Sequence, residues 1–297
     1  MKKDKLMPRI GVIGIKNGWS SELLADTVGR MAGERILIEP DRICLDLPSG
    51  RVTSNGLELN ALDALIIKKI GSRYSPDLMD RLEILRYLAD RGMPIFSDPL
   101  RIMRVLDRLS CTITLQVNNI PMPPLTITEN VDSALRAVRE YGEAVFKPLY
   151  TSKARGMFVL RAEDNARGVI EEYKAKNKIM YIQKKIDLNG RDLGVVFLGG
   201  EYMTTYARCQ QDDAWNTTTA SGGRYEAVDP EPEIIELAYR AQAPFGLDFT
   251  CVDVVETSDG PMVFEVSAFG GFRGILEARN IDAAGLYVEY VRRRVEK

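Results

Sequence analysis

Two acidic residues near the end of the chain, Asp253 and Glu265, are placed where they could share a cation. Each stands in a short segment whose apolar and polar side chains alternate as in a half-buried strand, and the Asp259-Gly260 pair between the segments is a strong turn signal. A turn centred on Asp259 places Asp253 directly opposite Glu265, with Ser267 on the same face. The other face of this hairpin is predicted to be core and holds Val252, Val254, Phe264 and Val266.

Two opposed carboxylates need a compensating charge. At ~5 Å they repel each other by about 3 kcal/mol at an effective dielectric constant of ~20. A cation between them would offset that repulsion, and a set of oxygen ligands suits Mg²⁺ or Mn²⁺ better than zinc. The alternative is a solvated hairpin that carries two unrelated acids, and the hairpin alone leaves both interpretations open.

The composition limits the class of protein. A chain of 297 residues with 45% hydrophobic content can bury a large core and is expected to hold two or three subdomains. A net charge of −2 argues against a general nucleic-acid binder or a binder of anionic membranes. No apolar run approaches the ~18 residues of a membrane helix, and the four cysteines show no CxxC spacing, which favours reduced thiols in a cytoplasmic protein.

The chain contains no histidine. This excludes Ser-His-Asp and Cys-His nucleophilic systems, and it excludes zinc bound by histidine. Acid–base chemistry must therefore rest on carboxylates, lysine, tyrosine or the substrate itself.

The first third of the chain is predicted to be a parallel sheet with flanking helices. Gly11, Gly14 and Gly18 do not match the GxGxxG spacing and are interpreted as tight turns. The Pro121-Met-Pro-Pro124 segment predicts a linker after this unit. The predicted buried strands lie at residues 9–15, 36–38, 64–67 and 94–96, and the predicted helices at residues 20–32, 76–91 and 99–117.

A lysine and a basic loop in the middle of the chain could grip a polyphosphate. Lys147 ends a strand predicted at residues 143–147, and a polar, basic, glycine-containing loop follows at residues 149–156. The lysine would supply charge, and the loop would supply backbone N–H donors. Arg208, which follows a predicted hairpin at residues 195–203, could brace a γ-phosphate. A solvated strand lysine and a surface arginine are the alternatives.

Taken in order, these segments resemble an ATP-grasp ligase, and most closely the RimK-type branch, whose members add glutamate or other amino acids to carboxylates. The resemblance runs from about Asp63 to the end of the chain. It is strongest at Val252-Asp253, in residues 260–266 and in the tail of residues 270–285. A narrower resemblance is to the ATP-grasp member of the GAK gene system.

The resemblance implies an α/β fold with α+β lobes, in which an N-terminal parallel-sheet pre-ATP-grasp domain precedes a two-lobed ATP-grasp fold. The expected boundaries are residues 1–107 for the N-terminal domain, 108–186 for the central lobe and 187–297 for the C-terminal lobe with the metal site. Proteins of this kind are commonly dimers or tetramers, so a homo-oligomer is expected.

The resemblance also implies which residues contact the phosphates. Arg108 matches a basic residue, usually lysine, that approaches the α-phosphate. Lys147 matches the lysine on the α- and β-phosphates, and Arg208 matches a phosphate-facing arginine. The flexible flap over the phosphates matches residues 151–156, which include Ser152, Lys153 and Gly156.

The base and the ribose have their own matching residues. Asp192 matches an acid near the ribose, and Lys184 stands where the adenine hinge usually carries an acid. The hinge as a whole matches Gln183, Lys184, Lys185 and Ile186, and a loop that contributes nucleotide or metal contacts matches Asn216, Thr217 and Thr218.

The metal carboxylates of the family match Asp253 and Glu265. The third ligand position, commonly asparagine, is Ser267, whose shorter side chain still offers an oxygen. On the substrate side, Gly194 stands where relatives carry an arginine, and Ala220 replaces a polar residue.

The implied reaction uses ATP and Mg²⁺ (or Mn²⁺) and needs no enzyme nucleophile, which suits a chain without histidine. ATP phosphorylates a substrate carboxylate, and an amine then displaces the phosphate to give an amide, with Lys147, Arg208 and the metal neutralising phosphate charge. Arg273 could hold the carboxylate of an incoming amino acid, or it could lie at the surface. The expected partners are a small-molecule carboxylate and an amino acid or amine, or a peptide or protein terminus.

Two other functions are compatible with the same residues. One is an ATP-grasp kinase that phosphorylates a hydroxyl and forms no amide. The other is a non-catalytic, ATP-binding regulatory subunit, in which the changes at Gly194, Ala220 and Ser267 have removed turnover.

Overall fold

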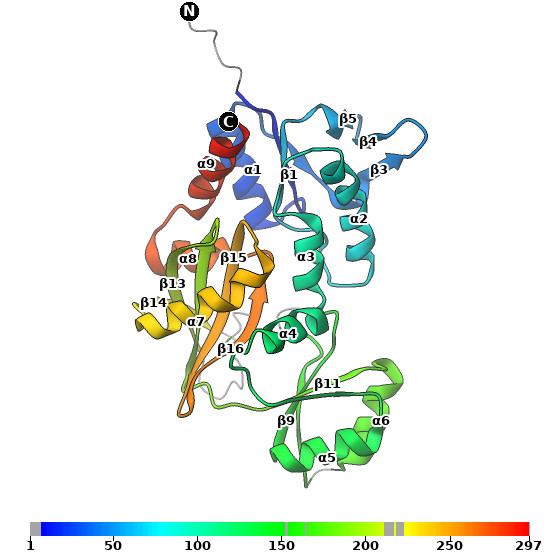
Figure 1. Ribbon diagram of the computed structural model, residues 1–297, viewed down its shortest axis with the longest axis vertical. Coiled ribbons are helices and arrows are strands. Elements are labelled where there is room, and N and C mark those ends of the chain that lie inside the picture. The colour runs from blue at the N-terminus through cyan, green and yellow to red at the C-terminus, as the bar shows by residue number, and fades with distance from the viewer. Residues whose placement is uncertain (1–6, 152–153, 164, 211–216, 218–222, 297) are drawn as a thin grey trace, which may run out of the picture.

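The computed structural model describes residues 7–151, 154–163, 165–210, 217 and 223–296. Its strands form a parallel sheet near the N-terminus and antiparallel sheets in the middle and C-terminal parts of the chain (Figure 1). This arrangement confirms the predicted α/β class with α+β lobes. Every helix in the described ranges is too short or too polar to cross a membrane.

The N-terminal sheet has the strand order β2-β1-β6-β7, and all of its pairings are parallel. β1 and β6 are buried along their whole length, as their continuous apolar sequences predict. A small antiparallel sheet, β3-β4-β5, was not predicted. The elements of this part are β1 (Ile10–Ile13), α1 (Trp19–Ala32), β2 (Leu37–Ile38), β3 (Ile43–Asp46), β4 (Arg51–Ser54), β5 (Leu57–Glu58), β6 (Ala64–Ile67), α2 (Asp77–Asp90) and β7 (Ile95–Phe96).

The single helix predicted at residues 99–117 is wrong, because the structure has two helices there, α3 (Pro99–Leu106) and α4 (Arg108–Val117). Asp107 between them has an extended backbone, with φ −73° and ψ 102°. Its carboxylate accepts hydrogen bonds from the backbone N–H groups two and three residues on, at 2.9 and 3.2 Å. An aspartate in this role is a strong N-cap, and it makes Arg108 the first residue of α4.

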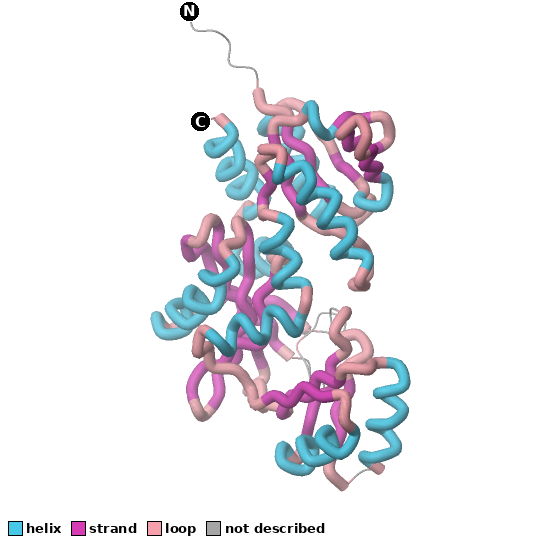
Figure 2. The backbone as a smooth tube through the Cα atoms, turned by 45° about the vertical axis from the view of Figure 1, so that its right-hand side comes forward, coloured by secondary structure: helices cyan, strands magenta, loops and turns pink. Residues whose placement is uncertain are grey.

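The central sheet is antiparallel, with the order β10-β9-β11-β8, and two helices pack on it (Figures 1 and 2). Phe146 and Ile182 are fully buried between the sheet and the helices. The elements are β8 (Leu125–Thr128), α5 (Val131–Tyr141), β9 (Glu143–Lys147), β10 (Phe158–Arg161), α6 (Ala166–Lys176) and β11 (Met180–Lys184). Lys147 ends β9, as predicted.

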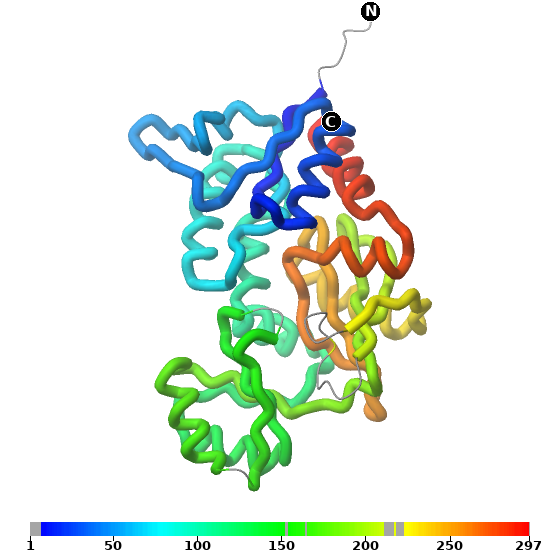
Figure 3. The backbone as a smooth tube through the Cα atoms, turned by 180° about the vertical axis from the view of Figure 1, so that it is seen from behind, coloured from blue at the N-terminus to red at the C-terminus, as the bar shows by residue number. Residues whose placement is uncertain are grey.

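The C-terminal sheet is also antiparallel, with the order β14-β13-β12-β15-β16. Its strands are β12 (Arg191–Leu198), β13 (Glu201–Cys209), β14 (Arg224–Ala227), β15 (Phe249–Thr257) and β16 (Gly260–Ser267), and its helices are α7 (Pro232–Gln242), α8 (Phe272–Arg279) and α9 (Ala283–Val295). The chain then returns to its beginning, because α9 packs beside α1 (Figure 3). Leu24 and Val28 of α1 share one hydrophobic core with Tyr287 and Val288 of α9.

The β15–β16 hairpin has the predicted register at the end that lies away from its turn. Asp253 pairs with Glu265, and Cys251 pairs with Ser267. Beyond Asp253 the register shifts by one residue, so Val254 pairs with Val263 and not with Phe264. The prediction of Phe264 as a core residue is therefore wrong.

The shift changes which side chain of β16 enters the core. Val263 is fully buried there, whereas Phe264 is only partly buried and lines a cavity. The physical reason is an extra residue in β16, since one added residue in a strand turns the following side chain to the other face.

Candidate active site

A cavity of about 380 Å³ brings together most of the predicted site residues. Its walls come from α4, from β9 and β11 of the central sheet, and from β12, β13, β15 and β16 of the C-terminal sheet. The predicted residues that line it are Arg108, Lys147, Gln183, Lys184, Lys185, Ile186, Asp192, Arg208, Thr217, Asp253, Glu265 and Ser267.

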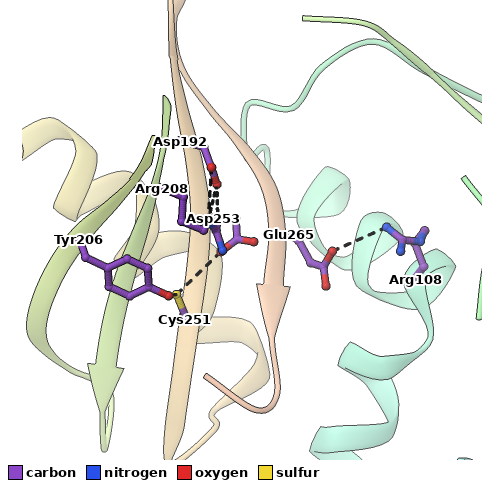
Figure 4. A network of polar contacts seen from close by, with 7 residues as sticks. All are labelled: Arg108, Asp192, Tyr206, Arg208, Cys251, Asp253 and Glu265. Atoms are coloured by element: carbon purple, nitrogen blue, oxygen red, sulfur yellow. Dashed lines mark hydrogen bonds and ion pairs between the residues drawn. The ribbon is translucent and has the colours of Figure 1, made fainter. Parts of the chain in front are cut away.

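Arg208 lies between two carboxylates on neighbouring strands (Figure 4). It pairs directly with Asp192 across the β12–β13 ladder, and its Nε donates to the Asp192 Oδ2 at 3.0 Å. Its Nη2 lies 2.9 Å from the Oδ1 of Asp253 on β15. These three side chains are mostly buried, so each charge depends on the others for compensation.

Burial shifts the titration of Asp253. Removal from water raises the pKa of this carboxyl to about 6, and the negative charges of Asp192 and Glu265 add to the rise, while Arg208 opposes it. The carboxylate form therefore depends on a neighbouring cation. Arg208 supplies one, and a metal ion at this position would act in the same direction.

Lys147 reaches the cavity from the end of β9. Its Nζ donates to the Oε1 of Gln183 at 2.5 Å and lies 5.3 Å from the centroid of the Phe264 ring. Burial lowers the pKa of Lys147 to about 7; the positive charge of Arg108 adds to the drop and Glu265 opposes it. An anionic ligand in the cavity would favour the ammonium form.

Arg108 connects the loop after β9 to the second predicted metal carboxylate. Its Nη2 donates to the carbonyl oxygen of Thr151 at 3.1 Å, and its Nη1 lies 3.7 Å from the Oε2 of Glu265. Its side chain is 11% exposed, and its Nε is buried with no hydrogen-bond partner among the described residues. A buried donor of this kind can serve an incoming acceptor such as a phosphate oxygen.

The predicted metal ligands are compatible with Mg²⁺ held jointly with a nucleotide. Asp253, Glu265 and Ser267 face the same cavity and offer only oxygen. Within the described ranges, no group of three or more His, Cys, Asp or Glu side chains is arranged to hold a metal ion. Mg²⁺ is commonly bound by one or two carboxylates, with phosphate and water completing its shell, so this donor set is sufficient.

Some predicted residues lie elsewhere. Arg273, on α8, is not in the cavity wall: its guanidinium lies over the Trp19 ring, 5.1 Å from the centroid, and 3.7 Å from the Oε1 of Glu277. Gly156 has a φ of +68° in the turn before β10 and is also outside the wall. The remaining predicted residues, Ser152, Lys153, Asn216, Thr218 and the substituted Ala220, lie outside the described residues.

Tyr206 is a cavity residue that sequence reasoning missed. A Cβ added at Gly194 would lie 2.6 Å from the Cζ of Tyr206, and one added at Gly274 would lie 2.6 Å from its Cε2. The ring therefore fills the space that a side chain at position 194 would need. In the sequence, Gly194 is the residue that signals a change at this place, because relatives carry an arginine there. It does not predict that a tyrosine fills the space.

Comparison with solved structures defines the fold class. The ATP-grasp ligase PsnB, in complex with a phosphomimetic variant of minimal precursor, Mg and ADP, matches with a TM-score of 0.77, 16% identity and coverage of 99% of this chain and 100% of that chain. A RimK domain protein ATP-grasp from Sphaerobacter thermophilus matches with a TM-score of 0.74, 21% identity and coverage of 95% and 98%. The fold is that of ATP-grasp ligases.

Sequence comparison identifies the family. The sequence model of one protein family, the RimK-like ATP-grasp domain, matches residues 105–291 of this chain. A tetrahydromethanopterin:alpha-L-glutamate ligase from Methanocaldococcus jannaschii is 26% identical over 239 residues, which are 78% of this chain and 80% of that protein. The chain belongs to the RimK-like ATP-grasp family, so the predicted resemblance to the RimK-type branch is confirmed, and the protein is an enzyme of the carboxylate–amine ligase class. The narrower resemblance to the ATP-grasp member of the GAK gene system stays a prediction.

Proposed function

We propose that the protein is an ATP- and Mg²⁺-dependent ligase that joins an amino acid to a small-molecule carboxylate through an acyl phosphate. The observation that carries this proposal is the cavity, in which two basic side chains, Lys147 and Arg208, lie with the opposed acids Asp253 and Glu265. Cations suit the phosphates, and opposed acids suit the metal that accompanies them.

The reaction proceeds in two displacements. A carboxylate oxygen attacks the γ-phosphorus of ATP, the bond to the β-phosphate oxygen breaks, and ADP leaves. The amine nitrogen then attacks the acyl carbon, the bond from that carbon to the phosphate oxygen breaks, and the departing phosphate takes up the proton that the nitrogen loses as the amide forms. Lys147, Arg208 and Arg108 position the phosphates and offset their charge, and no side chain has to act as a nucleophile.

Asp253, Glu265 and Ser267 would hold Mg²⁺ in this proposal. An ion held by these residues would offset the negative charge of the phosphates. Gln183 and the following hinge residues, Lys184, Lys185 and Ile186, would contact the base, because they line the same cavity from the central sheet.

We assign L-glutamate as the amine-bearing partner. The name of the Methanocaldococcus jannaschii relative, an alpha-L-glutamate ligase, supports this assignment. That relative acts on tetrahydromethanopterin by its name, whereas the PsnB structure, which shares the fold, holds a variant of a minimal precursor. The acceptor carboxylate is therefore the substrate to search for.

The test is a screen of small carboxylates with ATP, Mg²⁺ and hydroxylamine, with and without L-glutamate. A ligase yields a hydroxamate and stoichiometric ADP when the right carboxylate is present, even without glutamate. A hydroxyl-directed kinase yields a stable phosphomonoester, and a regulatory binder yields neither product. A phosphomonoester as the sole product, or ATP binding without any ADP release across the panel, contradicts the proposal.

A further inference from the structure

Lys68, just after β6, is a buried lysine that the reaction steps above do not use. Its side chain is 2% exposed, and its Nζ lies 3.4 Å from the centroid of the Phe272 ring and 5.2 Å from that of the Phe249 ring. Burial, with the adjacent Lys69, lowers the pKa of Lys68 well below its ordinary value. An amino group in such surroundings is costly to desolvate, and an apolar side chain of the same length would be the more stable occupant.

The amino group of Lys68 holds one specific turn. Its Nζ donates a hydrogen bond to the carbonyl oxygen of Gly270, and the two atoms are 2.5 Å apart. Gly270 lies in the turn that leaves β16 after Ser267 and leads into α8. The bond therefore ties the end of a strand in the N-terminal sheet to the segment directly after the predicted metal ligands.

This turn forms part of the cavity. Gly271, the residue before α8, lines the cavity, and nothing lies within 4 Å of a Cβ built on it, so its backbone faces open space. Gly270 is packed tightly, because a Cβ there would lie 2.7 Å from the Cε1 of Phe249. Lys69 and Phe269 also line the cavity, and the Nζ of Lys69 lies 5.2 Å from the centroid of the Phe269 ring.

The position of the turn indicates which substrate it serves. The hinge residues line the cavity from the central sheet, whereas this turn lines it from the junction of the N-terminal and C-terminal sheets. Glu265, which would hold the metal together with its pairing partner Asp253, lies on β16 between Phe264, which is next to Lys147 of the central sheet, and the turn after Ser267. A nucleotide that extends from the hinge to the metal leaves the region beside Gly271 for the acceptor.

We propose that Lys68 is a positioning residue for the acceptor: its amino group fixes the Gly270–Gly271 turn and the start of α8, and thereby sets the geometry in which the acceptor carboxylate and the amine bind. This inference rests on the proposed ligase function. Lys68 touches neither substrate, so its effect passes through the backbone of the turn.

The test compares Lys68→Met with Lys178→Met, the same chemical change at an exposed lysine. Lys68→Met keeps the length and the apolar contacts of the side chain but removes the donor. We expect a thermal midpoint equal to or above that of the wild type, because a desolvated amino group is gone. Amide hydrogen exchange at residues 270–273 should accelerate roughly tenfold or more, while Lys178→Met should leave it unchanged.

The kinetic readout uses L-glutamate and the carboxylate found in the screen. Lys68→Met should raise the KM for one or both acceptor-side substrates roughly tenfold and leave the KM for ATP within roughly twofold, since only the acceptor region loses its geometry. Lys68→Gln retains an N–H donor without the charge, and it should lie between Lys68→Met and the wild type in both readouts.

Three results overturn the inference. One is unchanged hydrogen exchange at residues 270–273 in Lys68→Met, and another is an equal rise in the KM values for ATP and for the acceptor. The third is a comparable loss of stability in Lys68→Met and Lys68→Gln, which identifies a purely structural lysine. If no carboxylate stimulates ADP release, the proposed function fails, while the exchange measurement still decides whether Lys68 positions the turn.

Discussion

At the scale of single residues, each predicted metal carboxylate lies beside an arginine. Arg208 is 2.9 Å from Asp253, and Arg108 is 3.7 Å from Glu265. These guanidinium groups offset the repulsion between the opposed acids. If the acids bind Mg²⁺ together with a nucleotide, the same positive charges can serve both the acids and the phosphates.

Removal of either acid should remove most of the effect of Mg²⁺ on nucleotide binding. Calorimetric titration of the wild type with ADP should show tighter binding with Mg²⁺ than without it. Asp253→Asn and Glu265→Gln should each lose most of that gain, because the ion then has one carboxylate. Asp259→Asn, an exposed acid at the turn of the same hairpin, is the matched control and should behave as the wild type. If Mg²⁺ tightens ADP binding in both variants as much as in the wild type, the assignment of Asp253 and Glu265 as metal ligands is contradicted.

Lys147→Met should weaken ATP binding by roughly 1.5–3 kcal/mol, because it removes a charge-assisted contact with phosphate. AMP lacks the β- and γ-phosphates and should be affected much less. Isothermal titration with both nucleotides provides the comparison, and Lys178→Met serves as the control. Equal ATP affinity in the wild type and in Lys147→Met would contradict the assigned contact.

The titration of Lys147 predicts a proton linkage. Its pKa is about 7 in the protein without nucleotide, so at pH 8 to 9 the side chain is mostly neutral. A bound phosphate raises that pKa, and ATP binding at pH 8 to 9 should therefore take up about one proton, with affinity falling as the pH rises above 7. Titration in buffers of different ionisation enthalpy measures the uptake. Release of a proton on ATP binding at pH 8 to 9, or an equal proton uptake by Lys147→Met, would contradict this prediction.

At the scale of elements, the one-residue shift in β16 decides which side chains serve the core and which serve the cavity. Val263 enters the core, and Phe264 turns toward Lys147 and the cavity. On the other side of the shift, Asp253 still pairs with Glu265, the pairing on which the predicted metal site depends.

The stability of two neighbouring variants tests this register. Val263→Asn places an amide in the core without a partner and should lower the free energy of unfolding by about 3 kcal/mol. Phe264→Asn faces the cavity and should cost less than half of that. Urea denaturation of both variants measures the two losses of unfolding free energy. A larger loss in Phe264→Asn than in Val263→Asn would contradict the shifted register.

The elements show why sequence predicts some features and not others. The pairing of Asp253 with Glu265 follows from period-2 alternation and a strong turn signal, both of which are local. The shift at Phe264 has no local signal, because it depends on how β16 packs against the rest of the sheet. The break at Asp107 was missed since the apolar pattern continues through it, although an aspartate there is a known helix start signal.

In the candidate site, too, sequence predicts the residues that carry a local or family pattern and not those placed by tertiary contacts. Lys147 and Arg208 were recognised because their residue types and order match a family. Tyr206 and Lys68 were not, because their positions depend on contacts with Gly194 and Gly270 that are distant in the sequence or lie on other elements. Such contacts are set by tertiary packing, which no local pattern encodes.

At the scale of the whole molecule, the cavity lies where the central sheet, the C-terminal sheet and α4 come together, and Lys69, Tyr74 and Gly271 complete its wall. Figure 1 labels α4 and strands of both sheets. The packing of α9 beside α1 joins the two ends of the chain, so the predicted C-terminal lobe shares a core with the predicted N-terminal domain. The boundaries at residues 107 and 186, the homo-oligomer, Mn²⁺ as an alternative metal and the cytoplasmic location stay predictions.

The most direct test of the central claim follows oxygen from the acceptor carboxylate. The carboxylate found in the screen is labelled with ¹⁸O at both carboxylate oxygens and turned over with ATP, Mg²⁺ and L-glutamate, and the phosphate is examined by ³¹P NMR. An acyl-phosphate ligase transfers one carboxylate oxygen to each phosphate released, so the account predicts one ¹⁸O in every inorganic phosphate. Amide formation that releases phosphate without ¹⁸O would contradict it.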